Sequence, residues 1–286
     1  MDYYLISTAH LSEGLWFRDE DDYRTGMNYM AIVSYTLGIP VLAFVLMSNH
    51  VHMVIACNEE QALTFITEFK RLYSFYYRHK YKAKEFLRNN ECDYRKLSKE
   101  DESLERAIAY VQMNPVAANI CPHAFLYPWG TGSSFFDTRG VAGNLLSEYS
   151  FRHQIRMLHS NVRLPQNFRI DNGHIQPRSY VKTLLVEKLF RTPKRMNYFL
   201  FNSSKAKSRR ENQEALHPSF RDWSLSAFMT DLCRSLFNQE SLDKLNQAQQ
   251  AEIVRQLQYR FSADINQISR VSGVPYEDIC KYLDTF

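Results

Sequence analysis

The chain has 286 residues, of which 45% are apolar, 23% charged and 14% aromatic, and its formal net charge is +4. This balance is typical of a folded protein with room for about two domains, and it excludes wholesale disorder. The longest apolar run, residues 39–47, is about half as long as a membrane-spanning helix, and the first residues lack the basic start of a signal peptide. We therefore expect a cytoplasmic protein with no membrane segment. Five scattered cysteines without a CxxC pair predict neither a disulfide framework nor a zinc knuckle.

The first half of the chain predicts an α+β domain. Hydrophobic periodicity, turn residues and helix-capping residues define its elements. The predicted elements are a strand at 3–7, a helix from about 20 to 37, a hairpin of strands at 41–47 and 50–56, helices at 59–80 and from Asp101 to Pro115, and a last strand near 133–136. This order predicts an antiparallel sheet with helices on one face.

The second half reads as helical. A loop of small and polar residues at 137–144 places the domain boundary near residue 140, so that the domains expected are 1–140 and 141–286. The second and smaller domain is predicted to be all-helical, with helices at 180–190, 223–237 and 247–260 and a helix-turn-helix at 263–284. The last helix begins with Tyr276, Glu277 and Asp278, so DNA reading and simple packing stay equally open for it.

Basic residues gather in two stretches, although the net charge is small. Residues 70–99 carry ten Lys or Arg against three acids and are interleaved with aromatic residues, and residues 188–210 carry eight Lys or Arg and no acid. Cations that follow phosphates and rings that stack on unpaired bases suit single-stranded nucleic acid. The alternative is a solvated helix face whose rings point into the core. The predicted DNA-binding residues are Lys70, Arg71, Arg78, Lys80, Lys82, Lys84, Lys194, Arg195, Lys205, Lys207, Arg209 and Arg210.

Two histidines lie two positions apart on a predicted strand. Side chains alternate along a strand, so His50 and His52 project from one face about 7 Å apart and can bind one metal ion. Tyr110 and Asn114 are four residues apart on a predicted helix, which places both on one helix face. A nucleophile and an oxygen ligand would therefore arrive together, although Tyr110 could also be an ordinary core aromatic residue.

Three ordered motifs carry a family resemblance. Residues 46–55 read LMSNHVHMVI, residues 109–118 read AYVQMNPVAA, and residues 127–134 read YPWGTGSS. With these motifs the first 136 residues resemble the single-tyrosine transposases of the HUH superfamily, most of all the REP-associated tyrosine transposases. The resemblance implies an HUH nuclease fold of the ferredoxin-like kind. It adds little about residues 150–286.

The resemblance also implies roles for individual residues. It makes His50, His52 and Asn114 the ligands of a divalent ion, Mg²⁺ or Mn²⁺, and Tyr110 the nucleophile that attacks a DNA phosphodiester to form a 5′-phosphotyrosine. Two departures from the family pattern are visible. Ser48 stands where the family usually has Pro, and residues 117–119 read AAN where Arg-Ala-Gly is usual, which puts one DNA contact in doubt.

The function expected from the sequence is that of a transposase, a metal-dependent single-stranded DNA endonuclease and strand transferase. Its expected partner is DNA, single-stranded or hairpin, and the chain is expected to be a monomer or homodimer. A domesticated DNA-binding protein or regulator that keeps the fold without transposing is the alternative. A water-using metal phosphoesterase is disfavoured, because few Asp or Glu residues lie near the histidine pair.

Overall fold

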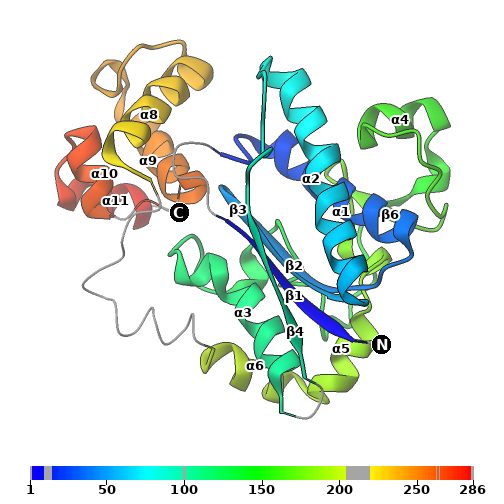
Figure 1. The fold of residues 1–286 in the computed structure, drawn as a ribbon. Helices are drawn as coiled ribbons and strands as arrows, with labels where there is room; N and C mark the ends of the chain where they lie inside the picture. Colours follow the sequence, from blue (N-terminus) through cyan, green and yellow to red (C-terminus); the bar gives the residue numbers. More distant parts are fainter. Residues whose placement is uncertain are drawn as a thin grey trace.

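The structure is a computed structural model that describes residues 2–9, 15–98, 101–203, 220–261, 263 and 265–284. Its centre is a four-stranded antiparallel sheet with strand order β2-β3-β1-β4 (Figure 1). The elements of this first part are β1 (Tyr3–Thr8), α1 (Glu20–Leu37), β2 (Val41–Met47), β3 (His50–Ala56), α2 (Glu59–Tyr81), β4 (Cys92–Leu97) and α3 (Ser103–Ala117). The α+β class, the first helix and the hairpin predicted from the sequence are confirmed.

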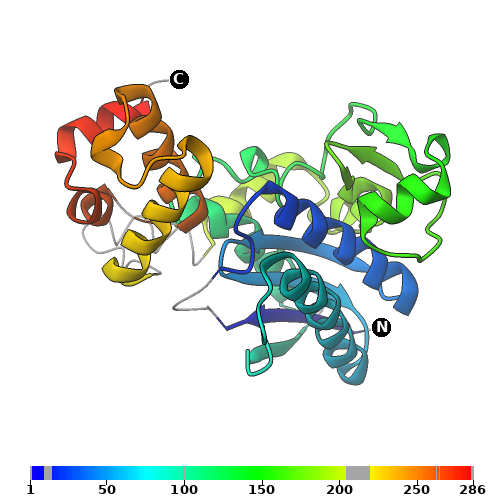
Figure 2. The same ribbon diagram turned by 90° about the horizontal axis from the view of Figure 1, so that it is seen from above.

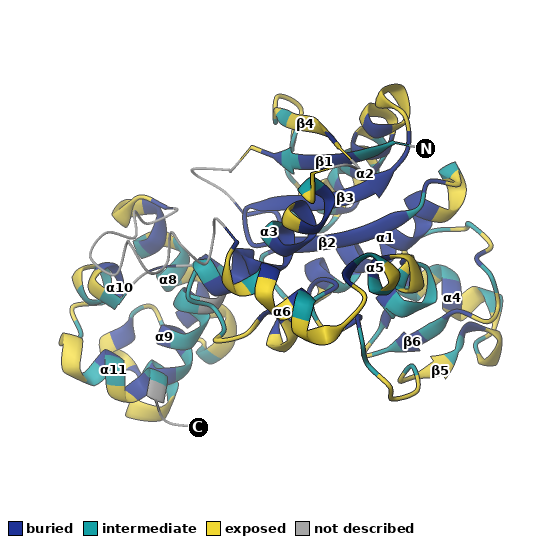
Figure 3. Ribbon diagram, turned by 90° about the horizontal axis from the view of Figure 1, so that it is seen from below, coloured by how far each residue is buried: buried dark blue, intermediate teal, exposed yellow. Residues whose placement is uncertain are grey.

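Helices cover both faces of the sheet, which corrects the expectation of helices on one face. Helices α1 and α2 lie side by side on one face, and α3 lies on the other (Figure 2). Every residue of β2 and β3 is buried (Figure 3). A strand that is apolar on both sides must be covered on both sides. The unbroken apolar run of β2 therefore indicates helices on both faces of the sheet.

The fourth strand was missed by the sequence analysis. Residues 92–97 read CDYRKL, which resembles a basic connector, yet they pair along β1 from Thr8↔Cys92 to Tyr3↔Leu97. An edge strand is held by backbone hydrogen bonds and tolerates charged side chains that face water. Sequence polarity therefore conceals this strand.

The strand expected near 133–136 is wrong. This segment forms turns and bends, and the chain touches the sheet at Gly130, which makes an isolated bridge with Val45. A Cβ at Gly130 would lie 2.7 Å from the carbonyl oxygen of Phe44, so glycine permits this close approach.

Residues 144–203 do not form a separate helical domain. They contain a small antiparallel sheet of β5 (Asn144–Leu145), β6 (Arg169–Asp171) and β7 (His174–Ile175), together with η2 (Leu146–Glu148), α4 (Phe151–Leu158), η3 (Pro177–Ser179), α5 (Thr183–Phe190) and α6 (Pro193–Phe201). Their apolar side chains join the core of the first part. Helix α6 packs on α3. The short helix η1 (Ala124–Leu126), which follows α3 in the sequence, also contacts α3. The expected boundary at residue 140 and the expected all-helical second domain from residue 141 are therefore corrected.

A second hydrophobic core begins at residue 220. It unites α8 (Asp222–Phe237), η4 (Leu242–Lys244), α9 (Gln247–Phe261), α10 (Ile265–Ser272) and α11 (Tyr276–Asp284). The pair α10 and α11 is joined through Gly273 at a φ of 72°, which is the predicted helix-turn-helix arrangement. Leu15 belongs to this core, and Arg18 pairs with Asp231 at 3.8 Å, so the two parts of the chain are in contact.

Two further features of the fold concern the cysteines and the possibility of a membrane-spanning helix. The five cysteines form no disulfide with one another; Cys57 and Cys233 are buried and the other three are half-buried. No helix in the described part of the chain is long and apolar enough to cross a membrane.

Candidate active site

The histidine pair lies on β3, on the sheet face that α3 covers. His50 and His52 are 5% and 3% exposed, and their ring centroids are 4.8 Å apart with the planes nearly perpendicular. The register pairs His52 with Val45 on one side and Ser7 on the other, so the pair sits between two hydrogen-bonded neighbours near the end of the sheet. The strand thus holds both imidazoles on one face, as the alternation of side chains predicts.

Each imidazole is oriented by a hydrogen bond at Nδ1. His50 Nδ1 lies 2.7 Å from Asn49 Oδ1, and His52 Nδ1 lies 2.8 Å from Ser7 Oγ. A ring held at Nδ1 would have to coordinate a cation through Nε2, and such supporting bonds fix ring orientation in metal sites. The sequence analysis did not identify Ser7 or Asn49. Their signal was visible only in part, since Asn49 immediately precedes His50 but Ser7 reaches His52 through the strand pairing.

Tyr110 extends from α3 toward this pair. Its ring centroid lies 5.3 Å from that of His52, with the two planes at 78°. The side chain is half-buried, and this burial raises the pKa of the phenol above its ordinary value. The structure therefore brings the predicted nucleophile and the histidine pair together, although they are 58 positions apart in the sequence.

Asn114 has a structural reason for its orientation. Pro115 lies inside α3 and has no N–H to donate to Val111, which corrects the expectation that Pro115 ends this helix. The Asn114 Nδ2 atom donates instead to the carbonyl oxygens of Tyr110 at 2.8 Å and Val111 at 3.3 Å. With its nitrogen committed to the helix, the amide would present Oδ1 as a ligand.

The edge strand β4 contributes two charges that the sequence analysis missed. Asp93 pairs in register with Ser7, and Arg95 pairs with Leu5, so both project from the face that carries His52. Arg95 lowers the pKa of Tyr110 and Asp93 raises it, and both effects are smaller than that of burial. Because residues 92–97 have the polarity of a connector, the sequence pattern does not associate Asp93 and Arg95 with the site.

The donor set at this site is mixed. Among the residues that the structure describes, no three His, Cys, Asp or Glu side chains converge on one point. A cation at the histidine pair would therefore need an amide or phosphate oxygen to complete its shell, and Asn114 is the side chain that α3 offers.

The predicted DNA contacts of the first basic stretch, residues 70–84, lie on the opposite face of the sheet from Tyr110. They belong to α2 and the segment after it, where Arg78, Lys82 and Lys84 lie at the surface. Three other predicted DNA contacts are engaged within the protein: Lys70 donates to Asn90 O at 2.5 Å, Arg71 pairs with Glu68 at 2.7 Å, and Lys80 pairs with Asp19 and Asp22 at 2.7 and 2.8 Å.

The aromatic residues of the same stretch form part of the core. Tyr73 and Tyr76 are buried, and Tyr77 stacks on Phe86 with ring centroids 3.7 Å apart, whereas Phe75 is 66% exposed. The structure therefore favours the alternative of a solvated helix face whose rings point inward.

The second basic stretch begins on the same side of the sheet as Tyr110. Lys194 is exposed in the first turn of α6, and Arg195 pairs with Glu102 and Glu105, both at 3.2 Å. The remaining predicted contacts lie outside the described residues; they are Lys205, Lys207, Arg209 and Arg210.

Comparison with known proteins agrees with this geometry. Residues 15–114 match the family model described as "Transposase IS200 like", a range that contains all four candidate residues. The transposase resemblance drawn from the three motifs is confirmed. The match runs from Leu15 to Asn114, which is less than half of the chain, and it does not extend to the helices beyond Asn114.

The chain was also compared with curated proteins and with solved structures. No curated protein matches the chain. The solved structure of a REP-associated tyrosine transposase bound to a REP hairpin is similar, with 10% identity and a TM-score of 0.38 over 60% of this chain and 93% of that chain.

Proposed function

We propose that this protein is a transposase, acting as a single-stranded DNA endonuclease and strand transferase in which Tyr110 is the nucleophile. The observation that carries the proposal is the position of the Tyr110 ring, 5.3 Å from His52, inside the segment that matches IS200-like transposases. A half-buried phenol whose ring lies against one imidazole of the histidine pair supports a catalytic role for Tyr110. The substrate we propose is DNA in single-stranded or hairpin form.

The residues present fit a divalent cation. His50 and His52 are oriented through Nδ1, and the Asn114 amide is fixed through its nitrogen, so two imidazole nitrogens and one amide oxygen form the protein ligand set. Mg²⁺ is the common cellular ion for phosphate chemistry, and Mn²⁺ suits imidazole better. Such a cation would supply Lewis-acid polarisation of the scissile phosphate.

The proposed step joins the Tyr110 oxygen to phosphorus and breaks the bond from phosphorus to the 3′ oxygen. The phenol proton is lost, the departing 3′ oxygen gains a proton, and the products are a 5′-phosphotyrosine and a free 3′-hydroxyl. The covalent link keeps the energy of the phosphodiester bond, so that a second 3′-hydroxyl can reverse the step and transfer the strand. The positive charge of Arg95 favours loss of the phenol proton, since it lowers the pKa of Tyr110 against the larger effect of burial.

Covalent capture tests the proposal. The protein is incubated with Mg²⁺ or Mn²⁺ and hairpin oligonucleotides taken from the DNA that flanks the gene, labelled at either end. A 3′-end label should move into a denaturation-resistant protein band, and a 5′-end label should not. Tyr110→Phe should abolish this adduct and keep DNA binding, because the ring stays and the hydroxyl is lost.

The control is Tyr94→Phe, which removes a phenol from the exposed edge strand β4. It should form as much adduct as the wild type. An adduct that persists in Tyr110→Phe would assign the nucleophile to another tyrosine. Cleavage without an adduct would indicate attack by water, and DNA binding with neither cleavage nor adduct would favour the domesticated binding protein.

A further inference from the structure

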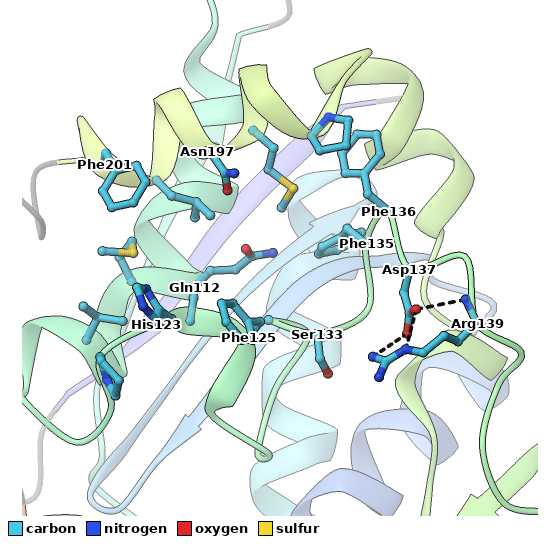
Figure 4. A pocket seen from close by; sticks show the side chains of 18 residues that line it. Gln112, His123, Phe125, Ser133, Phe135, Phe136, Asp137, Arg139, Asn197 and Phe201 are labelled. Atoms are coloured by element: carbon cyan, nitrogen blue, oxygen red, sulfur yellow. Dashed lines mark hydrogen bonds and ion pairs between the residues drawn. The ribbon is translucent and has the colours of Figure 1, made fainter.

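A pocket of about 790 Å³ lies beside α3 (Figure 4). Its walls are α3, the segments around η1 and residues 132–139, and α6. The pocket is of the size that accepts a small organic ligand or one to two nucleotides. Gln112 faces it only two residues after Tyr110, and residues at i and i+2 point to different sides of a helix.

Gln112 is the unusual residue of this pocket. Its side chain is 3% exposed, and neither Oε1 nor Nε2 has a hydrogen-bond partner among the described residues. Figure 4 shows the amide end directed into the pocket, with Asn197 of α6 directed toward the same space from the opposite wall. Because buried amides are normally satisfied, an amide that faces a pocket in this state is suited to a ligand with adjacent donor and acceptor atoms.

Aromatic rings occupy the rest of the wall. Phe125 is 59% exposed and stacks on His123 with ring centroids 5.3 Å apart and planes at 6°, and Phe201 of α6 is 52% exposed. The charged lining residues Asp137 and Arg139 pair with each other at 2.9 Å, so the lining has no excess charge. Flat rings together with the buried Gln112 amide are suited to a neutral, planar, polar-edged group.

We propose that this pocket binds an unpaired nucleobase of the DNA strand that Tyr110 cleaves, and that adenine is the best match. An amide of Gln forms a bidentate pair with adenine, and exposed rings such as Phe125 stack on unpaired bases. A strand held at Tyr110 passes close to the pocket, because the helix between them is about 10 Å across. The inference rests on the proposed function, since it assigns base recognition to the same DNA strand.

Binding of homopolymers tests the pocket directly. Fluorescence anisotropy compares labelled dA12 and dT12 with the full-length protein at fixed salt. The wild type should bind dA12 about tenfold more tightly than dT12. In Gln112→Leu this preference should vanish while affinity for dT12 changes less than twofold, and Gln247→Leu, at an exposed glutamine of α9, should keep it.

Folding and function are checked in parallel. Gln112→Leu should melt no lower than the wild type, because an apolar group of similar shape replaces an unsatisfied amide. If that variant does not fold, Phe125→Ala provides the second test, since an exposed ring can be removed without loss of core. It should weaken dA12 binding about fivefold or more, by the loss of one stacked base.

The outcomes separate the two proposals. Failure of the wild type to bind any single strand or to form the Tyr110 adduct would overturn the proposed function, and with it this inference. A normal adduct together with equal affinity for dA12 and dT12, or a preference that survives in Gln112→Leu, would overturn the base pocket alone. Undiminished dA12 binding by Phe125→Ala would do the same.

Discussion

The two faces of the central sheet are built from different kinds of side chain. Under α1 and α2, large rings fill the space: Trp16 stacks on Phe69 and Tyr73, and Phe17 stacks on Tyr23. Under α3 the sheet presents the imidazoles of the histidine pair instead, with the Tyr110 ring against them. Strand β3 therefore has one face that is apolar and one face that carries the histidine pair.

The difference between the faces indicates which one contributes to stability and which one to activity. Burial of large apolar rings stabilises the fold, whereas burial of polar groups costs free energy unless hydrogen bonds offset it. The α3 face meets that cost with the Nδ1 hydrogen bonds to Asn49 and Ser7. We therefore expect substitutions on the α3 face to change activity more than stability, and substitutions on the α2 face to do the reverse.

The largest expected effect comes from the histidine pair. Replacing both His50 and His52 with Ala should lower Mg²⁺- or Mn²⁺-dependent nicking about 10³-fold or more, because the cation that polarises the phosphate would be lost. Removal of the divalent ion from wild-type protein with a chelator should give the same loss. The melting temperature should change far less than activity. Initial nicking rates and thermal unfolding measured on the same preparations check both statements.

His79→Ala is the matched control, because His79 is exposed on α2. It should leave nicking and stability unchanged. Nicking that continues unaltered in the double variant would exclude the histidines as metal ligands and would remove the functional half of the comparison between the faces.

The next effect is expected on the α2 face. Lys80 pairs with Asp22, whose side chain is fully buried, and Tyr76 and Tyr81 also hydrogen-bond to this carboxylate. Lys80→Met should cost about 3 kcal/mol of unfolding free energy at pH 7, because a buried carboxylate loses its cation. Chemical denaturation checks this value. Lys82→Met, at a neighbour on the surface, should cost less than about 0.5 kcal/mol.

The pH dependence of the Lys80→Met effect has a defined sign. Burial, and to a lesser extent the charge of Asp19, raise the pKa of Asp22 above its ordinary value even with Lys80 present. A carboxyl with a raised folded-state pKa favours folding while it is protonated and loses that advantage as pH rises. The penalty of Lys80→Met should therefore shrink as pH falls toward about 4. A penalty that is constant with pH, or a normal stability with reduced DNA binding, would favour the DNA-contact role predicted for Lys80.

The sequence predicted best those features that depend on local pattern. The alternation along β3 predicted that both imidazoles share a face, and spacing on α3 predicted that Tyr110 and Asn114 do. It predicted less of the features that depend on strand pairing. Ser7 reaches His52 across 45 positions, and β4 is polar because it is an edge strand, so neither has an apolar signature.

The charge pattern does not show which basic residues are engaged within the protein. Lys70, Arg71 and Lys80 lie in a basic run, yet each has a partner that is near in space, and for Lys80 the partner belongs to another helix. A count of charges along the sequence does not register such pairs. The domain boundary shows a related limit. The small and polar residues at 137–144 resemble a linker, yet the apolar side chains of residues 144–203 pack into the first core.

The smallest expected effect concerns Arg95, at the edge where the polar face meets solvent. Its guanidinium lowers the pKa of the half-buried Tyr110 phenol and projects on the same side as His52. Arg95→Gln should slow adduct formation about tenfold, less than the roughly 10²–10³ typical of a buried donor, because solvent screens an exposed charge. The unfolding free energy should change by less than about 0.5 kcal/mol.

The neighbouring Lys96 provides the control for Arg95. It is also exposed on β4, but its side chain points to the other side of the strand and pairs with Asp2 at 2.7 Å. Lys96→Gln should therefore leave the rate of adduct formation unchanged. If the two variants slow the reaction equally, β4 acts through general attraction of DNA and the polar face ends at the histidines. If Arg95→Gln alone slows it, and higher salt reduces the difference from wild type, then the charge of this edge strand belongs to the active site.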